Sequence, residues 1–183
     1  MSSSAAAAWD DSLSDATLEL GRAIDAEFVT EQRAAELEAD QLARRRATIA
    51  DVARSAAHRG ETVEVRVAGR AFHGTIAGVG DDNVWLTSEV GDVHLVSAAV
   101  SAWRTLPGTS EGNEARDPGS IRALLRSREQ DGRVVSIVLA DGVEIDGSVR
   151  TVAGDHVILT DNLGEVLVAL GQVVGVLERP DRR

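Results

Sequence analysis

The sequence contains an internal repeat. Residues 49–67 align with residues 121–139 at a spacing of 72 positions, and after one extra residue, Asp141, the alignment continues at 73. The glycine at position 74 then falls on Gly147. A repeat with a single-residue insertion indicates a duplicated folding unit. Features shared by both copies therefore report the fold, and features found in one copy are candidates for function.

Each copy predicts a helix followed by short β-strands. Valines alternate with polar residues over 63–67, and apolar residues alternate in the same way over 135–139, which is typical of strands with one buried face. A glycine inside the next strand, Gly74 or Gly147, indicates sharp curvature or a close backbone approach. A helix followed by five short, bent antiparallel strands predicts a small closed barrel.

The N-terminal third predicts one long helix, from about residue 14 to residue 58. Phe28, Ala35 and Leu42 recur every seven residues, as in the narrow apolar stripe of a coiled coil. Two interpretations stay open for this stripe. It is either the seam of a dimer, and so a candidate protein interface, or one face of a solvated helix whose last turns pack on the first barrel.

The expected fold class is α+β and mainly β. A long N-terminal helix precedes two tandem five-stranded antiparallel β-barrels, each with its own leading helix. The stretch after residue 106 is rich in Gly, Pro, Ser and charge and indicates a linker. The expected parts are a helical extension (1–46), a first helix-plus-barrel repeat (47–106), a linker (107–117), a second repeat (118–179) and a tail (180–183).

Composition narrows the classes of partner. The chain has 19 basic residues, all arginine, against 30 acidic ones, for a net charge of −11. Nucleic-acid affinity depends largely on neutralising phosphates, so this balance disfavours RNA and DNA. The chain has no cysteine and no apolar run long enough for a membrane span. We therefore expect a cytoplasmic protein with no membrane contact.

The residues that usually carry catalysis form no recognisable constellation. The four histidines, at positions 58, 73, 94 and 156, have no helical metal-ligand spacing and no recurring acidic neighbour. No nucleophile elbow or phosphate-binding glycine loop is present. The expectation is a protein that is not an enzyme, with no catalytic residue, no cofactor and no metal.

One family resemblance is visible. Residues 132–142 (GRVVSIVLADG), Gly147 and residues 155–160 (DHVILT) resemble the first Sm motif of the Sm/LSm family, which includes Hfq. Residues 164–176 also resemble the end of the Sm-like C-terminal domain of the ribosome maturation factor RimP. The resemblance implies association, because Sm barrels pair a fourth strand with a fifth strand into rings. A tandem protein could satisfy one such edge internally.

The family's RNA-binding signature is missing from this chain. The stretches after the fourth strands, at 95–97 (LVS) and 168–170 (VAL), hold neither a basic residue nor a stacking aromatic. The expected function is therefore a non-catalytic adaptor or scaffold acting through self-association or another cytoplasmic protein. The alternative is an RNA- or ribosome-associated factor of the Hfq or RimP type.

Two tryptophans distinguish the copies. Trp85 and Trp103 align with the aliphatic residues Ile158 and Val176. Both are candidate protein-interface residues, because exposed tryptophan is enriched among interface hot spots. For Trp85 the other interpretation is a side chain shielded by the N-terminal helix or by the second barrel.

Overall fold

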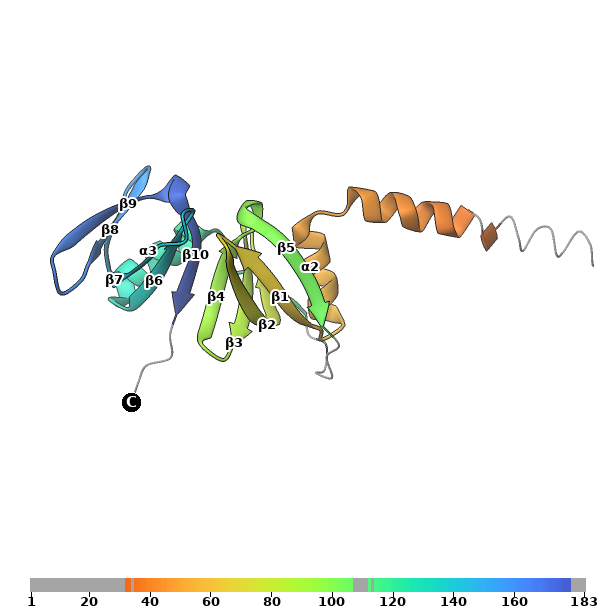
Figure 1. The fold of residues 1–183 in the computed structure, drawn as a ribbon, viewed down its shortest axis with the longest axis horizontal. Helices are drawn as coiled ribbons and strands as arrows, with labels where there is room; N and C mark the ends of the chain where they lie inside the picture. The colour runs from red at the N-terminus through yellow and green to blue at the C-terminus, as the bar shows by residue number, and fades with distance from the viewer. Residues whose placement is uncertain (1–31, 34, 107–111, 113, 179–183) are drawn as a thin grey trace, which may run out of the picture. The chain divides into compact units, whose positions relative to one another are not determined.

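The computed structural model describes residues 32–33, 35–106, 112 and 114–178. The chain divides into two compact units, residues 1–47 and residues 48–183, and each is described by itself. In the first unit the described backbone is helical over residues 35–46, and the side chains of that stretch are exposed. The second unit contains both copies of the repeat (Figure 1).

The long continuous helix expected up to residue 58 is wrong. The helix over 35–46 ends before Thr48, whose backbone is extended (φ −87°, ψ 168°), and a new helix, α2 (Ile49–His58), begins after it. The Asp51 backbone N–H donates to the Thr48 hydroxyl, and the Thr48 backbone N–H donates to the Asp51 carboxylate at 2.9 Å. This reciprocal capping box satisfies backbone donors at a helix start, so it favours a break over continuation.

Each repeat contributes five strands that lie close to the predicted positions. The elements of the first repeat after α2 are β1 (Thr62–Val67), β2 (Arg70–Val79), β3 (Asn83–Ser88), β4 (Gly91–Val96), a short 3-10 helix (Ser97–Ala99) and β5 (Val100–Leu106). The elements of the second repeat are α3 (Ile121–Asp131), β6 (Val134–Leu139), β7 (Glu144–Val152), β8 (His156–Thr160), β9 (Glu165–Ala169), a 3-10 helix (Leu170–Gln172) and β10 (Val173–Glu178).

All ten strands form one antiparallel sheet, so the expected pair of separate barrels is also wrong. The strand order is β5-β1-β2-β3-β4-β10-β6-β7-β8-β9. Within each repeat the order is the same, and the repeats join where β4 pairs with β10, side by side in Figure 1. A fourth strand thus pairs with a fifth strand inside one chain, an arrangement that the sequence allowed. Because that pairing occupies the edge of β4, the hydrogen-bonded ladder runs through both repeats without a break.

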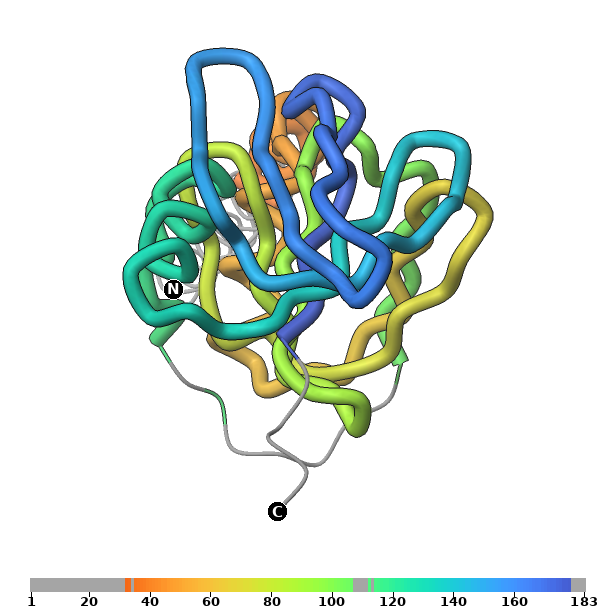
Figure 2. The backbone as a smooth tube through the Cα atoms, turned by 90° about the vertical axis from the view of Figure 1, so that its left-hand side faces the viewer, coloured from red at the N-terminus to blue at the C-terminus, as the bar shows by residue number. Residues whose placement is uncertain are grey.

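The curved sheet encloses two apolar cores, and β10 takes part in both. Figure 2 looks toward the second repeat and shows the curvature of its strands. The side chains of Val174 and Leu177 belong to the core of the first repeat, whereas Val173 and Val176 belong to the core of the second. This strand is therefore buried on both faces, which explains its nearly continuous run of valines.

The close backbone approach predicted for the glycine in β2 is confirmed at Gly74. A Cβ atom at this position would lie 2.3 Å from the backbone oxygen of Thr87 on β3. Such a distance is shorter than any non-bonded contact, so only glycine lets the two strands approach there. The curvature of β2 brings the sheet over α2, which packs on β2, while α3 packs on β7 in the second repeat.

The end of the expected linker runs along the first repeat. The backbone N–H of Val79 donates to Arg116 O at 2.9 Å, and the backbone N–H of Arg116 donates to Ala77 O at 3.0 Å. The Asn83 side-chain amide donates to Gly119 O at 2.7 Å. These bonds attach residues 116–119 to β2 and β3, directly before α3 begins.

A strained turn between β1 and β2 supplies a stability prediction. Ala68 has a positive φ of 48° and is followed by Gly69 at 76°, as in a two-residue type I′ hairpin. Replacing Ala68 by glycine removes the left-handed penalty and should stabilise the protein by about 1 kcal/mol in urea unfolding. The control Ala71→Gly, in β2, should destabilise by roughly 0.5–1 kcal/mol. Equal effects of both variants would show that the turn is unstrained.

Candidate association surface: the open edges of the sheet

The pairing of β4 with β10 is the best-buried strand contact between the repeats, and we call it the seam. It places Leu95 opposite Gly175, Val93 opposite Leu177, and His94 opposite Val176. All residues from Val173 to Leu177 are buried, as are those from Val93 to Leu95. The seam is thus an internal example of how a fourth strand and a fifth strand of this repeat fit together.

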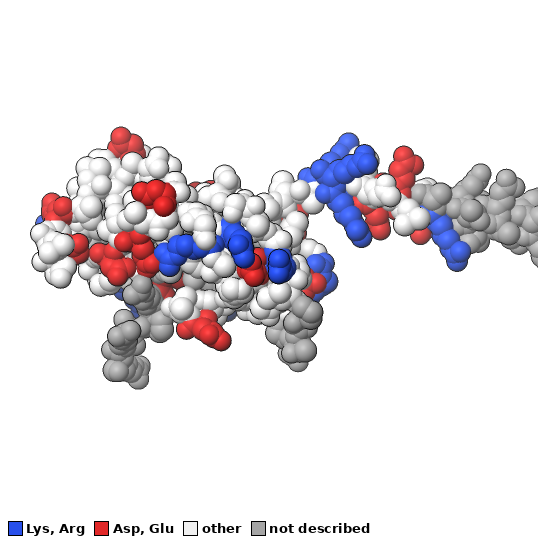
Figure 3. All heavy atoms as spheres, viewed as in Figure 1, with Lys and Arg blue, Asp and Glu red and all other residues white. Residues whose placement is uncertain are grey.

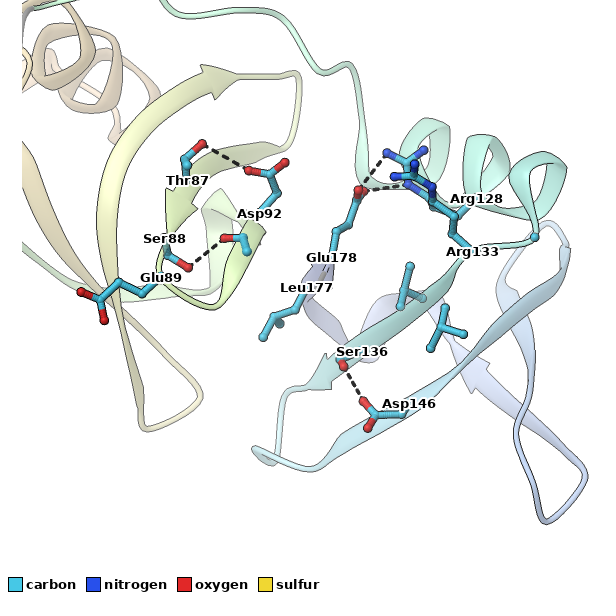
Figure 4. A pocket seen from close by; sticks show the side chains of 14 residues that line it. Thr87, Ser88, Glu89, Asp92, Arg128, Arg133, Ser136, Asp146, Leu177 and Glu178 are labelled. Atoms are coloured by element: carbon cyan, nitrogen blue, oxygen red, sulfur yellow. Dashed lines mark hydrogen bonds and ion pairs between the residues drawn. The ribbon is translucent and has the colours of Figure 1, made fainter. Parts of the chain in front are cut away.

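A cleft of about 720 Å³ lies beside the seam (Figure 4). The β3–β4 hairpin forms one wall with Ser88 and Asp92, and Leu177 and Glu178 of β10 face it. Glu178 accepts two hydrogen bonds from Arg128 of α3, at 2.8 and 2.9 Å. These bonds raise the pKa of the Arg128 guanidinium above its ordinary value and hold the end of β10 against α3.

The cleft has the chemistry of a packing contact. Two of its charged residues, Arg128 and Glu178, already bond to each other, and the buried Ser136 hydroxyl donates to Asp146. No histidine lines it. Among the described residues, no group of three or more His, Cys, Asp or Glu side chains could hold a metal ion. Leu177 of β10 and the polar residues at one end of β4 line this cleft together.

Beside the seam, the buried side chains of His94 and Asn83 form a cluster with neighbouring aromatic and charged side chains. His94 is 4% exposed and stacks on Trp85, with ring centroids 5.4 Å apart and an angle of 14°. One ring nitrogen lies 3.5 Å from Asn83 Oδ1, and the other lies 3.9 Å from Glu178 Oε1. Arg116 lies over the Trp85 ring at 6.0 Å. His94 thus connects β3, β4 and β10.

The ten-stranded sheet ends at β5 and β9, and neither strand pairs with a further described strand on its outer edge. β9 is the repeat equivalent of β4, and β5 is the equivalent of β10. The contrast in burial is large: Leu167 on β9 is 63% exposed, whereas its equivalent His94 is 4% exposed. Unpaired backbone N–H and C=O groups make an exposed strand edge a template for pairing with another chain. The two open edges therefore form the candidate site.

The structure places the sequence-predicted interface residues on different elements. Phe28 lies outside the described residues. Ala35 and Leu42 are exposed on the helix over 35–46. Trp85 is half-buried on β3, between His94 and Arg116. Trp103 is half-buried on the open edge strand β5, opposite Val65 of β1.

Sequence reasoning missed the edge residues that face outward, above all Leu167 and Arg104. The signal that could have found them was the repeat alignment itself. Leu167 replaces a histidine and Arg104 replaces Leu177 at equivalent positions. An alignment difference of this kind gains meaning only when the strand order shows which edges are covered and which are open.

Comparison with known proteins gives no family assignment. No family model matches this chain, and no curated protein matches it. The resemblance to the Sm/LSm family therefore stays a prediction. Among the described helices, none is long and apolar enough to cross a membrane.

The buried position of His94 makes seam stability depend on pH. Burial lowers the pKa of His94 below its ordinary value, with Glu178 and Asp92 opposing the shift. The folded state therefore favours the neutral ring. Its contribution to stability is present above about pH 6.5, where unfolded histidine is neutral, and is lost as the pH falls below that value.

Urea unfolding at about pH 7.5 and about pH 5.5 tests this dependence. The wild-type protein should lose stability over this interval, and the His94→Gln variant should lose less. The control His73→Gln removes an exposed histidine on β2 and should keep the wild-type slope. An identical slope in wild type and His94→Gln would contradict the assignment.

Proposed function

We propose that this protein is a non-catalytic scaffold whose copies join by pairing β9 of one copy with β5 of the next. The observation that carries the proposal is the seam. There the equivalents of these two strands, β4 and β10, already pair and bury each other. Since β9 and β5 are left at the ends of the sheet, the same contact can repeat between copies.

The seam supplies the register of this contact, which we call the joint. Moving the seam pairs by 73 positions places the exposed Leu167 of one copy opposite the half-buried Trp103 of the next. Cross-strand pairs of an aromatic with an aliphatic side chain stabilise antiparallel sheets by roughly 0.2–1 kcal/mol each. The neighbouring pairs in the joint are Val168 with Ala102, Val166 with Arg104, and Glu165 with Thr105.

A turn contact beside the seam also has an apolar counterpart in the joint. Within the chain, Arg70 of the first repeat donates to Glu144 of the second at 2.6 Å. The equivalent positions in the joint are Val143, an exposed valine, and Ala71 of the next copy, which is also exposed. An ion pair inside the chain is thus replaced by an apolar pair between copies. This change suits a contact that desolvates two exposed surfaces on assembly.

The proposed contact is directional. Each copy offers β9 at one end of the sheet and β5 at the other, so a head-to-tail assembly closes into a ring or grows into a filament. This is the mode of association that the Sm/LSm resemblance implies. It supports a scaffold in the cytoplasm, the compartment expected from the sequence, with a second copy as the first partner.

The RNA-associated alternative has weaker support. The face in Figure 3 shows a row of basic side chains across its middle, and the first repeat contributes exposed or half-exposed arginines such as Arg66 and Arg70. Both are committed to carboxylates: Arg66 pairs with Glu64 at 2.9 Å and Arg70 with Glu144 at 2.6 Å. Arginines neutralised in this way add little to phosphate binding.

A single edge substitution tests the proposed function. Leu167→Arg places a charge opposite Trp103 in the joint, and at 63% exposure the change should cost the fold little. Light scattering should find wild-type assemblies larger than one chain and should find the variant at the mass of one chain, 19.3 kDa. The matched control is Val134→Arg, at a residue of β6 that is also 63% exposed and lies outside the joint, which should assemble as the wild type does.

Two results would contradict the proposal. One is a wild-type protein that has the mass of one chain at every concentration measured. The other is an assembly that Leu167→Arg leaves intact, which would favour the helical stripe at Ala35 and Leu42. Absorbance at 260 nm of the purified protein separates the RNA alternative, because bound RNA would co-purify at moderate salt.

A further inference from the structure

The seam is closed by apolar side chains whose repeat equivalents are polar. Val138, Val174 and Leu177 of the second repeat are buried against the core of the first. The equivalent residues of the first repeat are Arg66, Ser101 and Arg104, and all three are exposed. The β5 end of the sheet therefore presents polar side chains, Arg104 among them, where β10 presents apolar ones.

On the opposite wall one acidic residue is gained, where Asp161 replaces Ser88, and one is lost, where Asn162 replaces Glu89. In the seam, Leu177 shares the cleft with Ser88 and Asp92 of the β3–β4 hairpin (Figure 4). The equivalents of these two residues in the β8–β9 hairpin are Asp161 and Glu165. In the joint, Arg104 thus takes the position that Leu177 has in the seam, and Asp161 takes the position of Ser88. In Figure 3, acidic side chains also gather toward the end that carries β8 and β9.

We propose that Arg104 of one copy binds Asp161 of the next, which makes the joint an electrostatic and reversible counterpart of the seam. This inference rests on the proposed function, since it describes how β9 and β5 of two copies meet. The partner it names is a second copy of this chain, with its arginine edge turned toward the acidic hairpin.

The groups concerned are held in position by their surroundings. The Asp161 carboxylate accepts hydrogen bonds from the backbone N–H groups of Leu163 at 2.7 Å and Gly164 at 3.0 Å, which fixes it at the hairpin tip. Arg104 lies opposite Glu64 across β1 and β5, and Glu64 already binds Arg66 at 2.9 Å. Of the two arginines on this surface, Arg104 is the one whose seam equivalent, Leu177, faces the hairpin.

Charge at the joint has a consequence that an apolar seam does not share. Ion pairs formed between copies in contact with solvent weaken as salt screens them, whereas apolar burial does not. Assembly between copies should therefore loosen with rising salt while the repeats of one chain stay joined. Light scattering at roughly 50 mM and roughly 500 mM salt should show this as a fall in assembly mass.

Charge reversal identifies the arginine. Arg104→Glu brings a carboxylate against Asp161, and it should weaken association at low salt by about tenfold or more. The control Arg126→Glu makes the same change of charge on the exposed face of α3 and should leave association unchanged. Circular dichroism verifies that both variants are folded.

Two further variants separate a specific contact from a general charge effect. Mixing Arg104→Glu with Asp161→Arg should form a joint that neither variant forms alone. Arg104→Leu restores the residue found in the seam, so its assemblies should persist and lose their salt dependence.

The outcomes distinguish this inference from the proposed function. If Leu167→Arg reduces the protein to single chains while Arg104→Glu and high salt leave the assembly intact, the electrostatic joint is overturned. The proposed scaffold function is then still supported. If no wild-type assembly forms at either salt concentration, both are overturned. Rescue in the mixed sample, together with salt-resistant assembly of Arg104→Leu, supports the inference.

Discussion

The pairing of β4 with β10 determines the architecture of the described sheet. It converts two five-stranded repeats into one ten-stranded ladder, and it makes β10 a member of both cores. Each backbone group that pairs across the seam is removed from water, and unpaired buried backbone groups are costly. The seam therefore fixes the repeats against each other and, by the same act, fixes which two strands are left at the ends.

Because the two repeats are equivalent, the residues of the seam can be compared directly with those of the two edge strands, β5 and β9. Where β4 buries His94, β9 exposes Leu167, and where β10 buries Leu177, β5 exposes Arg104. The two repeats pair within the chain through β4 and β10. The strands at the two ends of the sheet, β9 and β5, are the repeat equivalents of these paired strands. In the proposed assembly a second copy of the chain is the partner, because β9 of one copy pairs with β5 of the next.

The two copies have diverged most where the contacts differ. The seam contains apolar residues, whose exposure to water would be unfavourable. Arginine and serine occupy the equivalent positions of the first repeat at the β5 edge. Charges on an edge strand also limit uncontrolled pairing with other proteins. In the proposed joint, the acidic hairpin before β9 faces Arg104 on the β5 edge.

The sequence by itself determined the repeat, the strand pattern and the close approach at Gly74, because each depends on local alternation or on one backbone requirement. It also singled out Trp103, which lies on an open edge strand. It did not determine that the helix breaks at Thr48, where a local capping box outweighs a continuous helical composition. Only the tertiary structure decided that the repeats share one sheet, and that Leu167 and Arg104 face outward. Strand pairing joins residues far apart in the chain, here Val93 with Leu177, so no local pattern shows which edge is covered and which is open.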